Sequence, residues 1–158
     1  MAFFATGNQE EALDIVQDAM LTLVKRYAQR NPEEWGPLFT RIVQNRIRDW
    51  YRREKVRNKW RVWFGKDDDD QQDIENMPDS GTNDPLRQIE NAGMNDELEH
   101  ALRVLPLRQQ QVFLLRVWEG LDVAETAKAL GISSGSVKTH YSRAVHRLRE
   151  VLGDYYHE

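Results

Sequence analysis

The chain has 158 residues, no cysteine and a formal net charge of −4. This length suits one ordinary domain or two small ones, and the lack of cysteine excludes disulfides and thiolate metal sites. No apolar run approaches the length of a membrane span, so the sequence predicts a cytoplasmic protein without membrane insertion.

The net charge hides two blocks of opposite sign. Residues 41–66 contain 10 Lys and Arg against 2 Asp and Glu, whereas residues 67–99 contain 1 against 12. Binding to a polyanion depends on the local patch of charge rather than on the sum over the chain. An acidic total is therefore compatible with a nucleic-acid partner for the basic block.

The first predicted element is an amphipathic helix from Asn8 to about Gln29. Asn8 and Glu11 have the spacing of a capping box, in which each residue satisfies a backbone N–H of the other. Apolar residues then recur at intervals of three and four. Asn31-Pro32 is expected to end the helix, because the residue before a proline disfavours the helical conformation.

A second helix is predicted to begin near Trp35 or Pro37, with an apolar stripe that continues to Trp50. From Arg41 onward its other face is basic, and aromatic residues are interleaved with the cations. Cations that neutralise phosphates, beside rings on which unpaired bases stack, are typical of proteins that bind single-stranded nucleic acid. The alternative is a charged helix with a few aromatic residues in the core, which is the expected role of Trp35 and Trp50. The density of the basic run favours nucleic-acid binding.

Residues 1–64 form the predicted N-terminal module, and its core looks incomplete. Each of two helices buries one stripe and needs partners on more than one side, so a further helix is expected before residue 1. Residues 65–94 are rich in acidic residues, Ser, Gly and Pro, and they predict a flexible acidic linker. The four consecutive residues Asp67–Asp70 lack the spacing of an ordered cation site.

Residues 95–158 predict a compact domain of four short helices. The first is expected to begin near Asn95, and the second to run from about Arg108 to Glu119. The last two lie on either side of Gly131, a residue suited to ending a helix, and Ser133 fits the N-cap of the final helix. Two helices joined by a glycine turn form a helix-turn-helix, whose second helix can enter a DNA major groove. An ordinary helical hairpin is the alternative.

Motifs for catalysis are absent from the sequence. It contains no phosphate-binding glycine loop, nucleophile elbow, zinc-binding helix motif or paired cysteines. The four histidines do not form a cluster of ligands, and His140 and His146 are expected to face DNA or solvent. The sequence therefore predicts an all-α protein that is not an enzyme and has no catalytic residue, metal or cofactor.

Three segments together resemble the extracytoplasmic-function sigma factors of bacterial RNA polymerase, a group of the sigma-70-like family. Residues 11–18, EALDIVQD, are similar to a helix of the family's region 2, and residues 41–46, RIVQNR, resemble its strand-opening segment. Residues 105–149 resemble its region 4. The helix-turn-helix alone is shared with many regulators, and the combination is much more specific.

The resemblance implies a transcription initiation factor that binds core RNA polymerase, directs it to −10 and −35 promoter elements and helps to open the DNA. For polymerase binding it implies Asp14, Gln17 and Asp18. The residues implied for single-stranded −10 DNA and for melting are Arg41, Asn45, Arg46, Arg48, Trp50, Tyr51, Arg52 and Arg53, with a base flipped out near Asn45. Those implied for duplex −35 DNA are Ser134, Ser136, Lys138, Thr139, Ser142, Arg143 and Arg147.

The sequence departs from the family pattern at its start. Region 2 of the family has a further helix before the one that contains residues 11–18. Only Met1–Gly7 precede that helix here, which agrees with the incomplete core and predicts a shortened N-terminal module. A second hypothesis is a helix-turn-helix transcriptional regulator that acts without sigma exchange. The sequence leaves open whether an anti-sigma factor is a partner.

Overall fold

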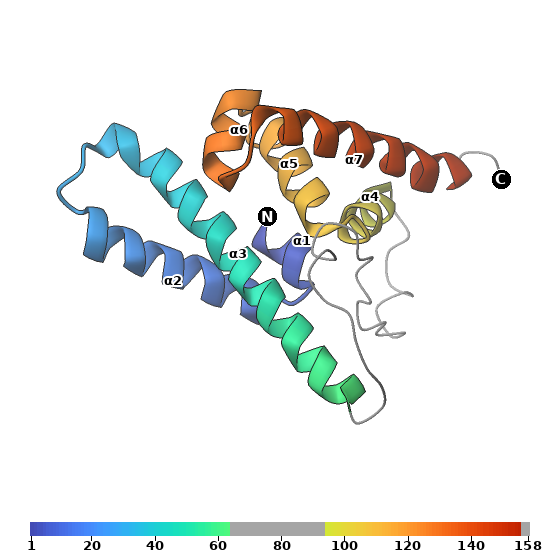
Figure 1. Cartoon of the computed structure of the whole chain (residues 1–158), viewed down its shortest axis with the longest axis horizontal. Coiled ribbons are helices and arrows are strands. Elements are labelled where there is room, and N and C mark those ends of the chain that lie inside the picture. The colour runs from blue at the N-terminus through green and yellow to red at the C-terminus, as the bar shows by residue number, and fades with distance from the viewer. Residues whose placement is uncertain (64–93, 156–158) are drawn as a thin grey trace.

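The computed structural model describes residues 1–63 and 94–155, and within these ranges the regular structure is helical (Figure 1). The predicted all-α fold is confirmed. The predicted linker, apart from Met94, lies outside the described residues. The helices are α1 (Ala2–Thr6), α2 (Gln9–Tyr27), α3 (Pro32–Trp63), α4 (Met94–Arg103), α5 (Leu107–Val117), α6 (Val123–Leu130) and α7 (Ser134–Tyr155). We refer to α1–α3 as the N-terminal module and to α4–α7 as the C-terminal module.

The N-terminal module is built on the antiparallel pair of α2 and α3 (Figure 1). The Asn8 side chain caps α2 by accepting hydrogen bonds from the backbone N–H groups of Glu10 and Glu11. This is the predicted N-cap. The buried stripe of α2, including Ile15 and Ala19, packs on the stripe of α3.

Helix α3 begins earlier than the sequence predicts. Its first residue is Pro32, and Pro37 lies inside the helix. Proline suits the first turn because its fixed φ is helical and the N–H that it lacks has no partner there. The resulting helix has 32 residues, about 48 Å at 1.5 Å per residue. It is longer than α2 and extends past it (Figure 1).

The C-terminal module contains the predicted helix-turn-helix in α6 and α7. Asp122 and Glu125 form a capping box at the start of α6, and Gly131 ends that helix with a left-handed φ of 67°. Ser133 then accepts a hydrogen bond from the backbone N–H of Ser136 at 3.1 Å, as expected of an N-cap. Val137, Ala144 and Leu148 of α7 are buried against the other helices.

The two modules pack against each other. Leu107 of α5 belongs to the core formed by α1, α2 and α3, and α6 lies directly on α3. Helix α1 lies between the modules, and its residue Phe4 packs against the C-terminal core. A core of α2 and α3 alone would be incomplete, and within the described structure α1 and Leu107 of α5 cover its remaining side.

None of the helices in the described ranges is long and apolar enough to cross a membrane. Among the same residues there is no group of three acidic or histidine side chains placed to hold a metal ion.

Candidate nucleic-acid interface

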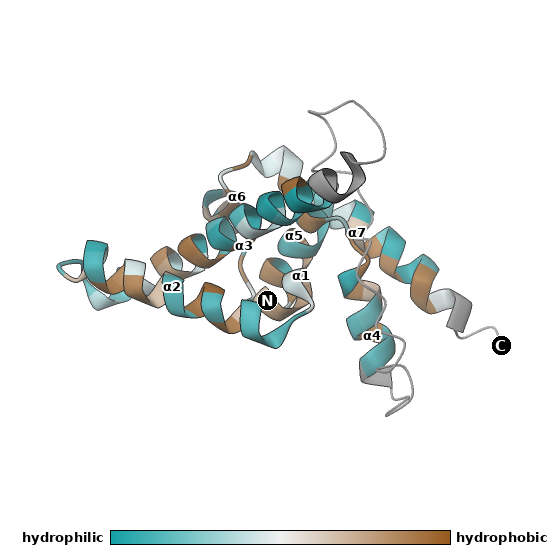
Figure 2. Ribbon diagram, turned by 90° about the horizontal axis from the view of Figure 1, so that it is seen from below, coloured by the Kyte–Doolittle hydropathy of each residue, from teal (hydrophilic) through white to brown (hydrophobic). Residues whose placement is uncertain are grey.

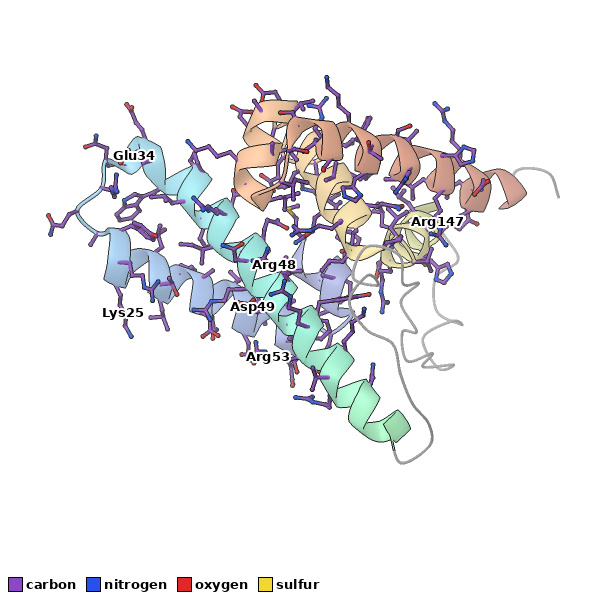
Figure 3. All side chains as sticks on the ribbon, viewed as in Figure 1. Lys25, Glu34, Arg48, Asp49, Arg53 and Arg147 are labelled. Atoms are coloured by element: carbon purple, nitrogen blue, oxygen red, sulfur yellow. The ribbon has the colours of Figure 1, made fainter. Side chains whose placement is uncertain are left out.

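The first half of α7 presents a polar, positively charged surface. Thr139 donates a hydrogen bond to the carbonyl oxygen of Gly135 at 3.1 Å, which holds its hydroxyl close to the helix. Ser136 and Arg147 are half-buried, and Figure 3 places Arg147 on the side of α7 toward α4. The predicted −35 residues that are exposed are Ser134, Lys138, Thr139, Ser142 and Arg143.

His140 does not face DNA or solvent, contrary to the sequence prediction. It is 5% exposed, because it lies three residues after Val137 and four before Ala144, on the stripe that packs into the core. His146 is exposed, as predicted, and its Nε2 lies 3.1 Å from a carboxylate oxygen of Glu150.

The predicted −10 residues of α3 occupy different surroundings. Arg41, Arg52 and Arg53 are exposed, and these three can reach an approaching strand directly. Asn45 and Arg48 are half-buried, and Figure 3 shows Arg48 where α3 passes α1.

Arg46 and Trp50 point toward α2 instead. Arg46 donates a hydrogen bond to the hydroxyl of Thr22 at 3.1 Å, and the indole N–H of Trp50 donates to the Glu11 carboxylate at 3.1 Å. Trp50 also packs against the N-terminal core, in agreement with its predicted core position. The structure therefore gives Arg46 and Trp50 contacts that position α3 on α2.

Helix α2 carries the predicted polymerase-binding residues on its outer surface, where Asp14, Gln17 and Asp18 are all exposed. Four large apolar residues of the same helix are also exposed, between 52% and 56%: Leu13, Met20, Leu21 and Val24. Polar and apolar turns alternate along α2 in Figure 2.

The exposed apolar residues of α2 are not among the site residues that the sequence predicts. The sequence does contain an indication of such a site, because the apolar residues of this helix cover a wider arc than a single core-facing stripe requires. Leu13, Met20 and Val24 recur at steps of seven and four, so they line one face with Gln17 between them. An apolar stripe with an acidic edge is suited to a protein partner.

The start of the chain lies half-buried where the modules meet. Met1 packs against both clusters of the C-terminal core. Burial lowers the pKa of the Met1 amino group, and the nearby Glu119 carboxylate acts in the opposite direction.

Family models and relatives match both modules. Residues 1–57 match sigma-70 region 2, and residues 95–148 match sigma-70 region 4. The chain is 31% identical over 153 residues to the RNA polymerase sigma-E factor of Streptomyces avermitilis, covering 90% of this chain and 84% of that relative. It is 28% identical to the ECF RNA polymerase sigma factor BldN of Streptomyces coelicolor, covering 96% of this chain and 54% of the relative. The chain is a sigma-70-family RNA polymerase sigma factor of the extracytoplasmic-function group.

A solved structure has the same fold as this sigma factor. It is the sigma factor RpoE of Bartonella quintana, in complex with the anti-sigma factor NepR, with a TM-score of 0.63 and 22% identity. The match covers 96% of this chain and 87% of that one, so it extends over both modules.

The family predicted from the sequence is confirmed, and so is its function in transcription initiation. The alternative, a regulator that acts without sigma exchange, is not favoured, because residues 1–57 match sigma-70 region 2 in addition to the region 4 match of residues 95–148. The roles of individual residues remain predictions.

Proposed function

We propose that this sigma factor binds core RNA polymerase through α2 and reads promoter DNA through α3 and α7. The observation that carries the proposal is that regions 2 and 4 are both present, and that each exposes a polar helical surface. In this role the chain contributes binding energy and no catalysis, and it works in the cytoplasm with the polymerase.

Binding to polymerase is assigned to the outer face of α2. Asp14, Gln17 and Asp18 supply polar contacts, and the exposed stripe of Leu13, Met20 and Val24 supplies apolar area. Interface energy concentrates in a few large apolar side chains surrounded by polar ones, and this face has that composition.

Recognition of the −35 duplex is assigned to the start of α7. Residues near the N-terminus of a recognition helix reach base edges in the major groove, which suits Ser134, Lys138 and Thr139. Arg143 and Arg147, farther along the helix, contact phosphates and set its orientation.

Capture of the −10 strand is assigned to α3. Its exposed arginines neutralise phosphates, while Asn45 and Tyr51 offer hydrogen bonds and an aromatic face to unstacked bases. Binding energy from the captured single strand shifts the DNA toward the open state without hydrolysis.

Run-off transcription with purified core polymerase tests the proposal. Genomic fragments incubated with polymerase and this sigma factor should yield defined transcripts that core polymerase alone does not produce. Duplex binding without any such transcript would contradict the assignment.

An anti-sigma factor is a further partner that we propose, since the solved neighbour was crystallised with one. Affinity capture of the tagged chain from its own cells, followed by mass spectrometry, tests this. A specific small partner absent from a control capture of a different sigma factor supports it, and recovery of polymerase subunits alone contradicts it.

A further inference from the structure

One hydroxyl group joins α2, the helix proposed to bind polymerase, to the basic helix α3. Oγ1 of Thr22 donates a hydrogen bond to the carbonyl oxygen of Asp18 at 2.8 Å, and it accepts one from Nη2 of Arg46 at 3.1 Å. Because a hydroxyl carries a single hydrogen, the bond to Asp18 leaves the lone pairs of Oγ1 to accept from Arg46. A charged donor makes such a bond stronger than one between neutral groups.

Arg46 reaches Thr22 because of its place on α3. It is half-buried, and it follows the buried residue Val43 by three positions and precedes the buried Ile47 by one. Side chains of a helix lean toward its N-terminus, so the Arg46 side chain extends back toward the connection between α2 and α3. Thr22 lies near that end of α2, which runs antiparallel to α3 (Figure 1).

A second hydrogen bond holds α3 one turn farther along. The indole N–H of Trp50 donates to the Glu11 carboxylate at 3.1 Å, and Trp50 follows Arg46 by four residues, so the two side chains share a face of α3. Bonds at two separate points resist both rotation of α3 about its axis and sliding along α2. Successive residues of a helix are rotated by about 100°, so the register of α3 decides which of its residues face away from α2.

This register relates two surfaces that are assigned to different partners. Asp18 is exposed on α2, is proposed to contact polymerase, and precedes Thr22 by one turn. The exposed arginines of α3 that are proposed to contact the −10 strand are Arg41, Arg52 and Arg53. Groups that are held in place before binding need not be ordered when the ligand arrives, which lowers the cost of binding. A fixed register therefore presents these arginines to DNA at a constant angle to the polymerase.

We propose that Arg46 is a positioning residue for promoter opening, which holds α3 in register on α2 through the Thr22 hydroxyl and does not itself bind DNA. The proposal rests on the functions proposed for α2 and α3. It distinguishes the half-buried Arg46 from the exposed Arg41, whose guanidinium is available to a phosphate. Loss of the Arg46 bond should weaken promoter opening without changing the affinity for polymerase or the number of phosphate contacts.

Two substitutions at Thr22 test the role of the hydroxyl with little change in shape. Thr22→Val replaces the hydroxyl by a methyl group, whereas Thr22→Ser keeps the hydroxyl and is the matched control. The assay uses core polymerase and a cognate promoter that carries 2-aminopurine in its −10 element. Thr22→Val should lower the equilibrium constant for opening about fivefold, the effect of one lost charge-assisted hydrogen bond.

Thr22→Ser should open the promoter like the wild type, and both variants should bind core polymerase with wild-type affinity. Equal defects in the two variants would overturn the proposal, because the hydroxyl would then be irrelevant. A loss of polymerase affinity that matches the loss of opening would also overturn it, because Thr22 would then act as part of the polymerase interface.

A double-mutant cycle tests whether Arg46 acts through Thr22. Arg46→Met removes the donor and keeps an unbranched side chain, so it should also reduce opening about fivefold. Combined with Thr22→Val it should cause no further loss, because each substitution removes the same hydrogen bond. Losses that multiply to about 25-fold would show that Arg46 acts independently of Thr22, and the proposal would be wrong.

The salt dependence of single-strand binding separates positioning from phosphate contact. A labelled −10 single strand should bind to the holoenzyme with the same logarithmic salt slope in Arg46→Met and in the wild type. Arg41→Met makes the same change at an exposed position of α3 and should reduce the slope by about 0.7, the value for one phosphate of a single strand. A reduced slope in Arg46→Met would overturn the proposal. A wild-type holoenzyme that binds no single strand would show that the DNA-binding role of α3 is itself wrong, and the proposal falls with it.

Discussion

The two helices proposed to bind DNA, α7 and α3, differ in how much of their surface is used for packing against other helices. Helix α7 buries one stripe within its own module and leaves its first polar residues exposed. Helix α3 packs on α2 through one side and on α1 and α6 through others, so that only part of its basic surface is open. A helix at the edge of a module can keep its binding face separate from its core face, whereas a helix shared by two modules cannot.

The largest effect is expected from the core that positions α3. Ile47 is 1% exposed, and Ile47→Ala should lower the free energy of unfolding by about 2–5 kcal/mol through lost burial and a cavity. Urea denaturation measures the change. Val56→Ala, at an exposed position of the same helix, is the control and should stay within about 0.5 kcal/mol of wild type. A similar loss of unfolding free energy in the two variants would mean that burial of Ile47 does not anchor α3 in the core.

On the α7 side, Lys138→Ala combined with Arg143→Ala should reduce transcription from a cognate promoter by about ten- to a hundredfold. Each lost base contact weakens the free energy of DNA binding by ~1–3 kcal/mol, and a lost phosphate contact weakens it by a similar or smaller amount. Binding to core polymerase should be retained, as measured by co-purification. Arg30→Ala, an exposed arginine between α2 and α3, serves as the control. Loss of polymerase binding in the double variant would show that this surface is not specific to DNA.

Truncation of the exposed apolar side chains of α2 should weaken binding to core polymerase while leaving the stability of the fold nearly unchanged. Leu13→Ala with Met20→Ala removes area that is more than half exposed, so the unfolding midpoint should hardly change. Affinity for core polymerase, measured by surface plasmon resonance, should fall about tenfold or more if these side chains are interface anchors. An unchanged affinity would restrict the interface to the polar residues Asp14, Gln17 and Asp18.

A smaller effect distinguishes the two neighbouring aromatic residues of α3. Trp50→Phe removes the hydrogen bond to Glu11 and keeps an aromatic ring, so stability should fall by about 1 kcal/mol with single-strand affinity unchanged. Tyr51→Ala should weaken single-strand binding by more than fivefold, since stacking on one base contributes ~1–3 kcal/mol. If Trp50→Phe alone reduced affinity, the indole would belong to the DNA-binding surface.

Local features of the fold were predictable because their causes lie within a few residues. Helical periodicity placed α2 and the helix-turn-helix, and the side chains of Asn8 and Ser133 cap the helices as their spacing predicts. The predicted start of α3 near Trp35 or Pro37 is wrong by three or more residues, because Pro32 is compatible with the first turn of the helix. The prediction that His140 faces DNA or solvent is wrong, because a single polar residue within an apolar stripe can be buried with that stripe.

Sequence alone determined the family, the all-helical fold and the polar character of α7, since these depend on residue types at short, regular spacings. Only the tertiary structure decided that Trp50 donates a hydrogen bond to Glu11, that Gln111 of α5 donates one to the Gln44 carbonyl oxygen, and that four apolar residues of α2 remain exposed. These contacts join residues far apart in the chain. Periodicity identifies which side of a helix is apolar, and the partner that covers each side is chosen by the packing of the whole molecule.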